Sequence, residues 1–325
     1  MQLSKFVWPI AVMVTLSWVY NKYKGRVFDD DLEHDYALVQ QYLLTEPSLA
    51  RSKKPIIWIH NTYDVNARSW QNFNSRNSAE LNQPYIYLTI KSIIEKCGAS
   101  FNVCLIDDTS FSRLLPSWAV DLQMVADPIR SKIRQLALAK VLYRYGGLIV
   151  PASFLCFQDL KPLVTTVKGE HKFVVAQLLD RNSTSTQVEF FPCPHFMGCT
   201  KESLTMHDFI MYLESQVSTD FTAESDFLGN TARWLNMKAM TGEITVLPAD
   251  EFGAKDSDGN AVTIDRLLGD TFLNLSGKVR GLYIPADEIL KRTKYQWFAR
   301  LSAKQLSSSD TMVAKYMAIQ GLFQS

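Results

Sequence analysis

Polar side chains that could bind a phosphate follow the first strongly apolar run of the chain. The run Ile56 to Ile59 is continuously apolar, which predicts a buried strand. His60 and Asn61 come directly after it, and Arg68 and Arg76 lie in the long polar stretch that follows. A guanidinium can bind phosphate through two N–H donors, and long loops in compact domains are often functional. We therefore expect these four residues to contact an anionic ligand; the alternative is a solvated loop with ordinary surface arginines.

Two carboxylates end the next apolar run. Asn102 to Ile106 predicts a second strand, and Asp107 and Asp108 follow it. Carboxylates at this place could accept hydrogen bonds from a base or from ribose hydroxyls. The alternative is that Asp108 caps a helix that opens near Ser110.

Basic residues begin the longest amphipathic pattern, from Ile129 to Tyr145, which predicts a helix. Arg130, Lys132 and Arg134 stand in its first turns. A helix N-terminus attracts anions, so we expect Arg134 in particular to lie near a phosphate. Solvated surface charges are the alternative.

The end of this helix carries the most specific motif. Tyr145-Gly146-Gly147 is followed by the apolar run Leu148 to Val150, a helix–turn–strand unit. This layout resembles the nucleotide-sugar-binding core of glycosyltransferases of the DXD sugar-binding type, which includes capsular-polysaccharide and mannosyl or galactosyl transferases. In that family the strand ends in Asp-x-Asp, which holds a divalent metal against the diphosphate of the donor. Here the same place reads Pro151-Ala152-Ser153.

Loss of both carboxylates leaves three alternatives. The protein is metal-independent, with a basic residue neutralising the diphosphate; or Asp107 and Asp108 supply the ligands for Mn²⁺ or Mg²⁺; or catalysis is lost and a binding fold remains. Proline and alanine cannot ligate a cation, and serine is a weak ligand without a carboxylate beside it. We therefore predict no metal ligands at this place and keep Ser153 only as a donor-binding residue.

The resemblance also implies a general base near the acceptor. Glu224 and Asp226 open a later helical pattern, and inverting transferases use a carboxylate to take the proton of the acceptor hydroxyl. The competing interpretation is a helix cap built from these acids with Thr222 and Ser225.

Strands and helices alternate from Pro55 onward, as expected of a parallel sheet with ligand chemistry at the carboxyl ends of its strands. The predicted fold class is α/β, a GT-A-like nucleotide-sugar-binding fold with a mostly parallel central sheet over residues 55–325. The implied activity is transfer of a hexose from a nucleotide-sugar donor to a glycan or lipid-linked acceptor. The alternative is a catalytically inactive, membrane-tethered binding or scaffold protein.

Composition excludes some other classes of protein. The 325 residues carry a formal net charge of +1, so no general field would attract nucleic acid, and we expect no nucleic-acid partner. Cys193, His195, Cys199 and His207 are residue types that bind zinc, but their spacing does not match that of a zinc knuckle. Asp256 to Asn260 contains a literal Asp-x-Asp, which we interpret as a turn. Disulfides between Cys97 and Cys104, or between Cys193 and Cys199, would need an oxidising compartment.

The N-terminus predicts a membrane anchor. Residues 3–20 are almost entirely apolar, and a helix of roughly 18 residues is long enough for a thin bilayer. No small-x-small cleavage site follows, which favours an uncleaved signal-anchor over residues 1–25 and a stem over residues 26–54. The protein is thus expected to be a single-pass membrane protein. Lys22, Lys24 and Arg26 favour a cytoplasmic domain, whereas the resemblance and two N-glycosylation sequons favour a Golgi or ER lumen.

Overall fold

The computed structural model describes residues 42–43, 54–61, 83–168, 173–179, 189–219 and 224–323. Contacts divide the chain between Leu43 and Leu44, and the elements below all belong to residues 44–325. None of the helices in the described ranges has the length and hydropathy needed to cross a bilayer. The predicted anchor over residues 1–25 and nearly all of the predicted stem lie outside the described residues, and their boundaries stay predictions.

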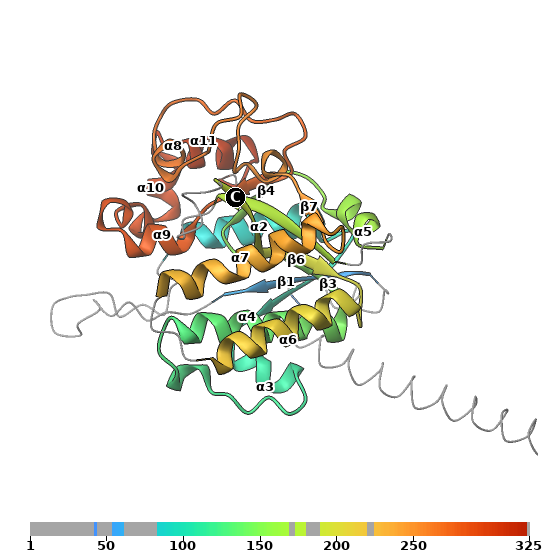
Figure 1. Cartoon of the computed structure of the whole chain (residues 1–325). Coiled ribbons are helices and arrows are strands. Elements are labelled where there is room, and N and C mark those ends of the chain that lie inside the picture. Colours follow the sequence, from blue (N-terminus) through green and yellow to red (C-terminus); the bar gives the residue numbers. More distant parts are fainter. Residues whose placement is uncertain are drawn as a thin grey trace, which may run out of the picture. The chain divides into compact units, whose positions relative to one another are not determined.

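A six-stranded mixed sheet forms the centre of the domain (Figure 1), in the order β2-β1-β3-β6-β5-β7. Its pairings β2-β1, β1-β3 and β5-β7 are parallel, and β6 runs antiparallel to both β3 and β5. This confirms the predicted α/β class with a mostly parallel sheet. The strands are β1 (Ile56–His60), β2 (Asn102–Ile106), β3 (Gly147–Ile149), β5 (Phe173–Leu179), β6 (Phe190–Cys199) and β7 (Thr245–Leu247).

A second, two-stranded sheet pairs β4 (Phe154–Cys156) with β8 (Gly281–Tyr283) in antiparallel fashion. The sequence did not reveal β4, because it follows the apolar run of β3 after only four residues. Its partner β8 comes from the C-terminal third of the chain, so this small sheet connects the two halves of the domain.

Helices cover both faces of the sheet (Figure 1). On one face α2 and the C-terminal helices pack against Ile57, Ile59 and Leu148. On the other face α4 lies beside α6, and Trp58 packs on Tyr145 of α4. The helices are α2 (Tyr85–Cys97), α3 (Phe111–Leu114), α4 (Ile129–Tyr145), α5 (Lys161–Lys168), α6 (Leu204–Ser218), α7 (Glu224–Met240), α8 (Ile264–Leu268), α9 (Ala286–Lys291), α10 (Ala303–Ser307) and α11 (Met312–Ile319).

Gly146 and Gly147 turn the chain from α4 into β3, as predicted. Their φ angles are +71° and +107°, in the region that glycine adopts without strain. A Cβ on Gly147 would lie 2.2 Å from the carbonyl oxygen of Ile56, so glycine also allows β3 to approach β1. The Trp58 indole donates a hydrogen bond of 3.0 Å to the carbonyl oxygen of Gly146, which fixes the turn against β1.

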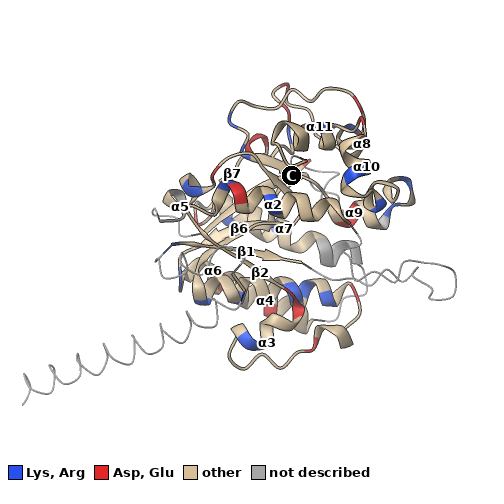
Figure 2. Cartoon of the chain, turned by 180° about the vertical axis from the view of Figure 1, so that it is seen from behind, with Lys and Arg blue, Asp and Glu red and all other residues tan. Residues whose placement is uncertain are grey.

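Basic and acidic residues are interspersed over the described elements (Figure 2). This distribution agrees with the near-zero net charge of the sequence.

Candidate functional site

The carboxyl ends of β1, β2 and β3 meet at one edge of the sheet because the three strands are parallel. From β1 the chain crosses first to β2 on one side, and later to β3 on the other. The strand order therefore reverses between β1 and β3, and ligands of open α/β sheets bind at such a switch point. Asn61 and Pro151 follow the two strands that flank it.

Three of the predicted site residues meet at the ends of β1 and β2. The guanidinium of Arg134 donates to both carboxylate oxygens of Asp108, with Nε–Oδ1 at 2.8 Å and Nη2–Oδ2 at 2.7 Å. His60 Nε2 lies 2.9 Å from Oδ1 of the same carboxylate, and its ring stacks on Phe111. Burial opposes ionisation, but Arg134 and His60 outweigh it and hold the pKa of Asp108 well below its usual range. Asp108 is thus an ionised anchor for both partners.

Asp107, and not Asp108, caps the short helix that follows β2. Its Oδ1 accepts hydrogen bonds from the backbone N–H of Ser110 at 2.9 Å and from the Ser110 hydroxyl at 2.6 Å. The Ser110 hydroxyl in turn accepts from the backbone N–H of Asp107, which completes a capping box for the 3-10 turn Asp108–Ser110. The cap expected of Asp108 is therefore made by Asp107, because Asp108 is turned toward Arg134. As donor-binding residues, Asp107 and Asp108 stay predictions.

Asn61 places an unused donor at the switch point. Only 6% of the residue is exposed, and its Nδ2 is buried without a hydrogen-bond partner. A buried amide N–H without a partner costs roughly 1–3 kcal/mol. Such groups are uncommon in native folds, and a ligand with an acceptor atom would satisfy this one.

The segment Pro151-Ala152-Ser153, where the sequence resemblance would place a metal-binding motif, is held by its backbone. Ala152 and Ser153 are 9% and 5% exposed. The carbonyl oxygen of Ala152 accepts from the Thr89 hydroxyl at 2.5 Å, and that of Ser153 accepts from the N–H of Ile284 at 3.3 Å. Proline, alanine and one nearly buried serine do not fit a divalent cation. Among the described residues, no three His, Cys, Asp or Glu side chains gather as metal ligands would.

Lys132 places a buried cation at the start of α4. It lies in the first turn of α4 with 5% exposure, and its Nζ donates to the hydroxyl of Thr231 on α7 at 2.7 Å. Burial lowers the pKa of Lys132 to about 8, and the negative charge of an ionised Cys193 partly offsets this effect. The sequence showed Lys132 only as one of three basic residues at a helix start; the fold turns it toward α7 and β6, away from Asp108.

Cys193, His195 and Tyr283 form a second polar cluster on this side. The negative charge of an ionised Cys193 raises the pKa of His195. The Tyr283 hydroxyl lies 3.3 Å from Nδ1 of His195. Tyr283 also pairs with Phe154, the residue after Ser153, so this cluster adjoins the Pro151-Ala152-Ser153 segment. Only spatial proximity reveals it, because Tyr283 is 88 residues from His195.

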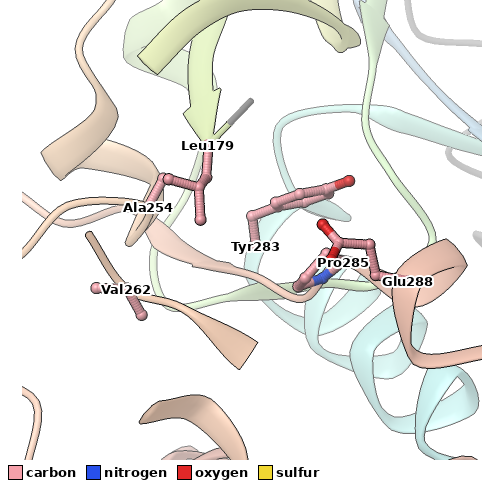
Figure 3. Close-up of a pocket in the computed structure, with 6 residues that line it drawn as sticks. All are labelled: Leu179, Ala254, Val262, Tyr283, Pro285 and Glu288. Carbon is pink, nitrogen blue, oxygen red and sulfur yellow. The ribbon is translucent and has the colours of Figure 1, made fainter. Parts of the chain in front are cut away.

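A small pocket lies beside the same tyrosine. Figure 3 shows Tyr283 between the apolar side chains on one side and Pro285 with Glu288 on the other. The remaining lining residues are Leu179, Ala254 and Val262. The pocket is largely apolar and does not contain the Cys193–His195 pair.

The other predicted site residues are only partly placed. Glu224 and Asp226 lie in the first turn of α7, and their side chains are outside the described residues. Arg68 and Arg76 lie wholly outside them. All four stay predictions.

Comparison with known proteins gives weak likenesses. No known family model and no curated protein matches the chain. A solved galactosyltransferase, LgtC in complex with donor and acceptor sugar analogs, matches 81% of this chain and 99% of its own, with 11% identity and a TM-score of 0.37. A 4-diphosphocytidyl-2C-methyl-D-erythritol synthase from Anaerococcus prevotii matches 65% of this chain and 94% of its own, with 10% identity and a TM-score of 0.30. At these values neither likeness bears on activity, so a functional assignment has to come from the site itself.

Proposed function

We propose that this protein is a metal-independent glycosyltransferase. It binds a nucleotide-sugar donor at the carboxyl edge between β1 and β3 and transfers a hexose to a glycan or lipid-linked acceptor. The observation that carries the proposal is the buried ammonium of Lys132 in the first turn of α4, the end of that helix at which Arg134 contacts Asp108 after β2. A fixed cation in a desolvated site can neutralise a departing diphosphate as a metal does.

In this proposal, each site residue has a separate role in donor binding or in sugar transfer. Lys132 stabilises the charge that develops on the leaving diphosphate, and Thr231 positions its ammonium. The unpartnered Nδ2 of Asn61 donates to an acceptor atom of the nucleotide. The pair Asp108–Arg134 holds the start of α4, and therefore Lys132, over the sheet edge. Glu224 or Asp226 serves as the general base, and Arg68 and Arg76 contact the donor from the loop after β1.

The membrane assignment remains part of this proposal. An N-terminal anchor over residues 1–25 would hold the catalytic domain beside a lipid-linked or glycan acceptor, on the cytoplasmic or the Golgi or ER lumenal face. The sequence pattern of residues 3–20 supports the anchor.

Calorimetric titration of the full-length chain, in mild detergent with EDTA, tests the proposal. UDP, GDP, CMP and their sugar conjugates are the ligands. We expect one nucleotide sugar to bind without metal, and Lys132→Met to weaken its binding at least about tenfold. The control is Lys140→Met on the same helix, where the lysine pairs with Glu214 at 2.7 Å. If no nucleotide binds in EDTA or with Mn²⁺, or if both variants bind equally well, the proposal is wrong.

One observation favours a second candidate, a catalytically inactive nucleotide-sugar-binding module. The Pro151-Ala152-Ser153 segment has lost the carboxylates of its family, and Asp108 is committed to Arg134 and His60. Donor turnover separates the two candidates. A transferase hydrolyses or transfers its donor slowly even without the natural acceptor, whereas the inactive module binds the donor and returns it intact.

A further inference from the structure

Two cysteines that are 59 residues apart in the sequence have their sulfur atoms in contact. Cys97 is the last residue of α2 and Cys156 is the last residue of β4, and their Sγ atoms lie 3.9 Å apart. Both side chains are buried. The Cys156 thiol also donates to the carbonyl oxygen of Gln158 at 3.1 Å, which holds its sulfur in place. A disulfide bond would require the two sulfur atoms to approach each other by about 2 Å.

Hydrogen bonds hold the backbones that carry these two thiols. The carbonyl oxygen of Cys97 accepts from the N–H groups of Ser100 and Phe101, each at 2.9 Å. The N–H of Cys156 donates to the hydroxyl of Ser92 at 2.9 Å. Since Ser92 lies on α2, the helix that carries one thiol is bonded directly to the residue that carries the other. The fold therefore presents the two sulfur atoms to each other from fixed elements.

The central sheet separates Cys97 from Cys104, one of the partners that the sequence suggests. Cys104 of β2 pairs in register with Trp58 of β1, and Trp58 packs on Tyr145 of α4. Residues that are directly paired in a sheet point to the same face. The side chain of Cys104 therefore lies on the α4 face, whereas α2 and its Cys97 cover the opposite face. A disulfide between these two cysteines would have to pass through the sheet.

The second pair suggested by the sequence, Cys193 with Cys199, is too far apart. Both residues lie on β6, where they pair with Ala176 and Phe173 of β5. These partners are three residues apart on an extended strand, which corresponds to about 10 Å. The Cα atoms of bridged cysteines are separated by less than about 7 Å. Cys97 and Cys156 are therefore the pair that the fold allows.

We infer that Cys97 and Cys156 form a disulfide when this chain folds in an oxidising compartment. The oxidant is a small-molecule disulfide such as oxidised glutathione. The thiolate of one cysteine attacks a sulfur of the oxidant, and a mixed disulfide forms as one glutathione thiolate leaves. The second cysteine thiolate then attacks the protein sulfur of the mixed disulfide and displaces the other glutathione. Two protein thiols are oxidised, one oxidant is reduced to two thiols, and those thiols take up the two protons.

The cross-link would close a long loop of the domain. The chain between the two cysteines contains β2, α4 and β3, and a disulfide that closes a loop restricts the unfolded chain. Because both sulfur atoms are buried in the folded domain, the bond forms while the chain folds. A disulfide of this kind persists in the secretory compartments and is rare in the cytosol.

Oxidative refolding of the full-length chain tests the inference. The reduced protein is refolded from urea in mild detergent with reduced and oxidised glutathione, free thiols are blocked with N-ethylmaleimide, and unreduced peptides are mapped by mass spectrometry. We expect one cross-linked peptide pair, joining Cys97 to Cys156, and no intramolecular bond at Cys104, Cys193 or Cys199. Thermal unfolding should show a melting temperature roughly 5–10 °C above that of the reduced protein.

Cys104→Ala is the matched control, because Cys104 is equally buried but lies on the other face of the sheet. This substitution should leave the cross-link and the difference in melting temperature unchanged, whereas Cys156→Ala should remove both. If Cys156→Ala does not refold, the peptide map of the unaltered protein decides alone. A different pairing, or a folded protein in which Cys97 and Cys156 both carry the blocking group, would overturn the inference.

Discussion

Arg134 and Asp108 form a two-point ion pair between the first turns of α4 and the end of β2. Both carboxylate oxygens are used, at 2.8 Å and 2.7 Å, and both side chains are about one-fifth exposed. Two parallel hydrogen bonds of this kind fix the orientation of the guanidinium relative to the carboxylate as well as the distance between them. Because Lys132 is two residues from Arg134 on the same helix, the pair also sets where the buried ammonium lies.

Replacing Arg134 by lysine should destabilise the protein although the charge is kept. A lysine ammonium cannot reproduce two parallel N–H donors, so one oxygen of Asp108 loses its partner. We expect the free energy of unfolding to fall by about 1–3 kcal/mol in urea denaturation. Arg113→Lys, at an exposed position of α3, should have no measurable effect. Equal stability of Arg134→Lys and the unaltered protein would show that the pair contributes nothing.

The same pair predicts how stability depends on pH. The folded-state pKa of Asp108 is lowered, so its contribution is fully present above the unfolded-state value of about 4 and is lost as the pH falls below it. Asp108→Asn removes the ionisation. We therefore expect the stability gap between the unaltered protein and Asp108→Asn to be large at pH 7 and to shrink between pH 4 and pH 3. Urea titrations at these pH values measure it, and a gap independent of pH would contradict the assignment.

Elements with a clear period were predictable from the sequence. The helix Ile129–Tyr145, its Gly146-Gly147 end and the second strand have the predicted bounds, and the first strand extends one residue further, to His60. The long strand β6 is not predictable from the sequence beyond Phe191, because Pro192, Pro194 and Gly198 argue against a central strand. The bulge at Pro194 and the close approach of Gly198 to β3 allow that strand to form. Neither can be seen in a local pattern.

The residues of the candidate site were also predictable only in part. Residues that follow predicted strands, such as His60 and Asp108, could be expected at one edge, and they lie in contact. Lys132 and Arg134 looked equivalent at a helix start, yet one faces α7 and the other β2. The pairing of His195 with Tyr283 joins strands from different sheets, so no spacing in the sequence could reveal it.

Glycine substitutions should separate steric exclusion from backbone strain at the turn before β3. Gly147→Ala combines a positive φ with a Cβ only 2.2 Å from the oxygen of Ile56, so β1 and β3 would have to separate. We expect loss of more than about 3 kcal/mol or failure to fold. Gly242→Ala keeps the positive φ of +78° but meets no atom within 4 Å, and should cost about 1 kcal/mol.

Gly277→Ala completes this series as a control. It meets no atom within 4 Å and has no positive φ, so its stability should be unchanged or slightly higher. Thermal unfolding of the three glycine variants measures how their stabilities rank. A Gly147→Ala variant as stable as Gly242→Ala would mean that β3 does not need its close approach to β1.

The literal Asp-x-Asp of the chain, at Asp256 and Asp258, should behave as a structural turn without a metal. Asp256 is 2% exposed; its Oδ1 accepts from the N–H of Asn260 at 2.7 Å, and its Oδ2 lies 2.8 Å from Nη2 of Arg266. Asp256→Ala leaves that guanidinium and the turn amides without their acceptor, so we expect a loss of about 2–3 kcal/mol. Asp258→Ala, at an exposed position, should cost little. A metal site would respond differently: both substitutions would then destabilise, and EDTA would lower the melting temperature of the unaltered protein as Mn²⁺ or Ca²⁺ raised it.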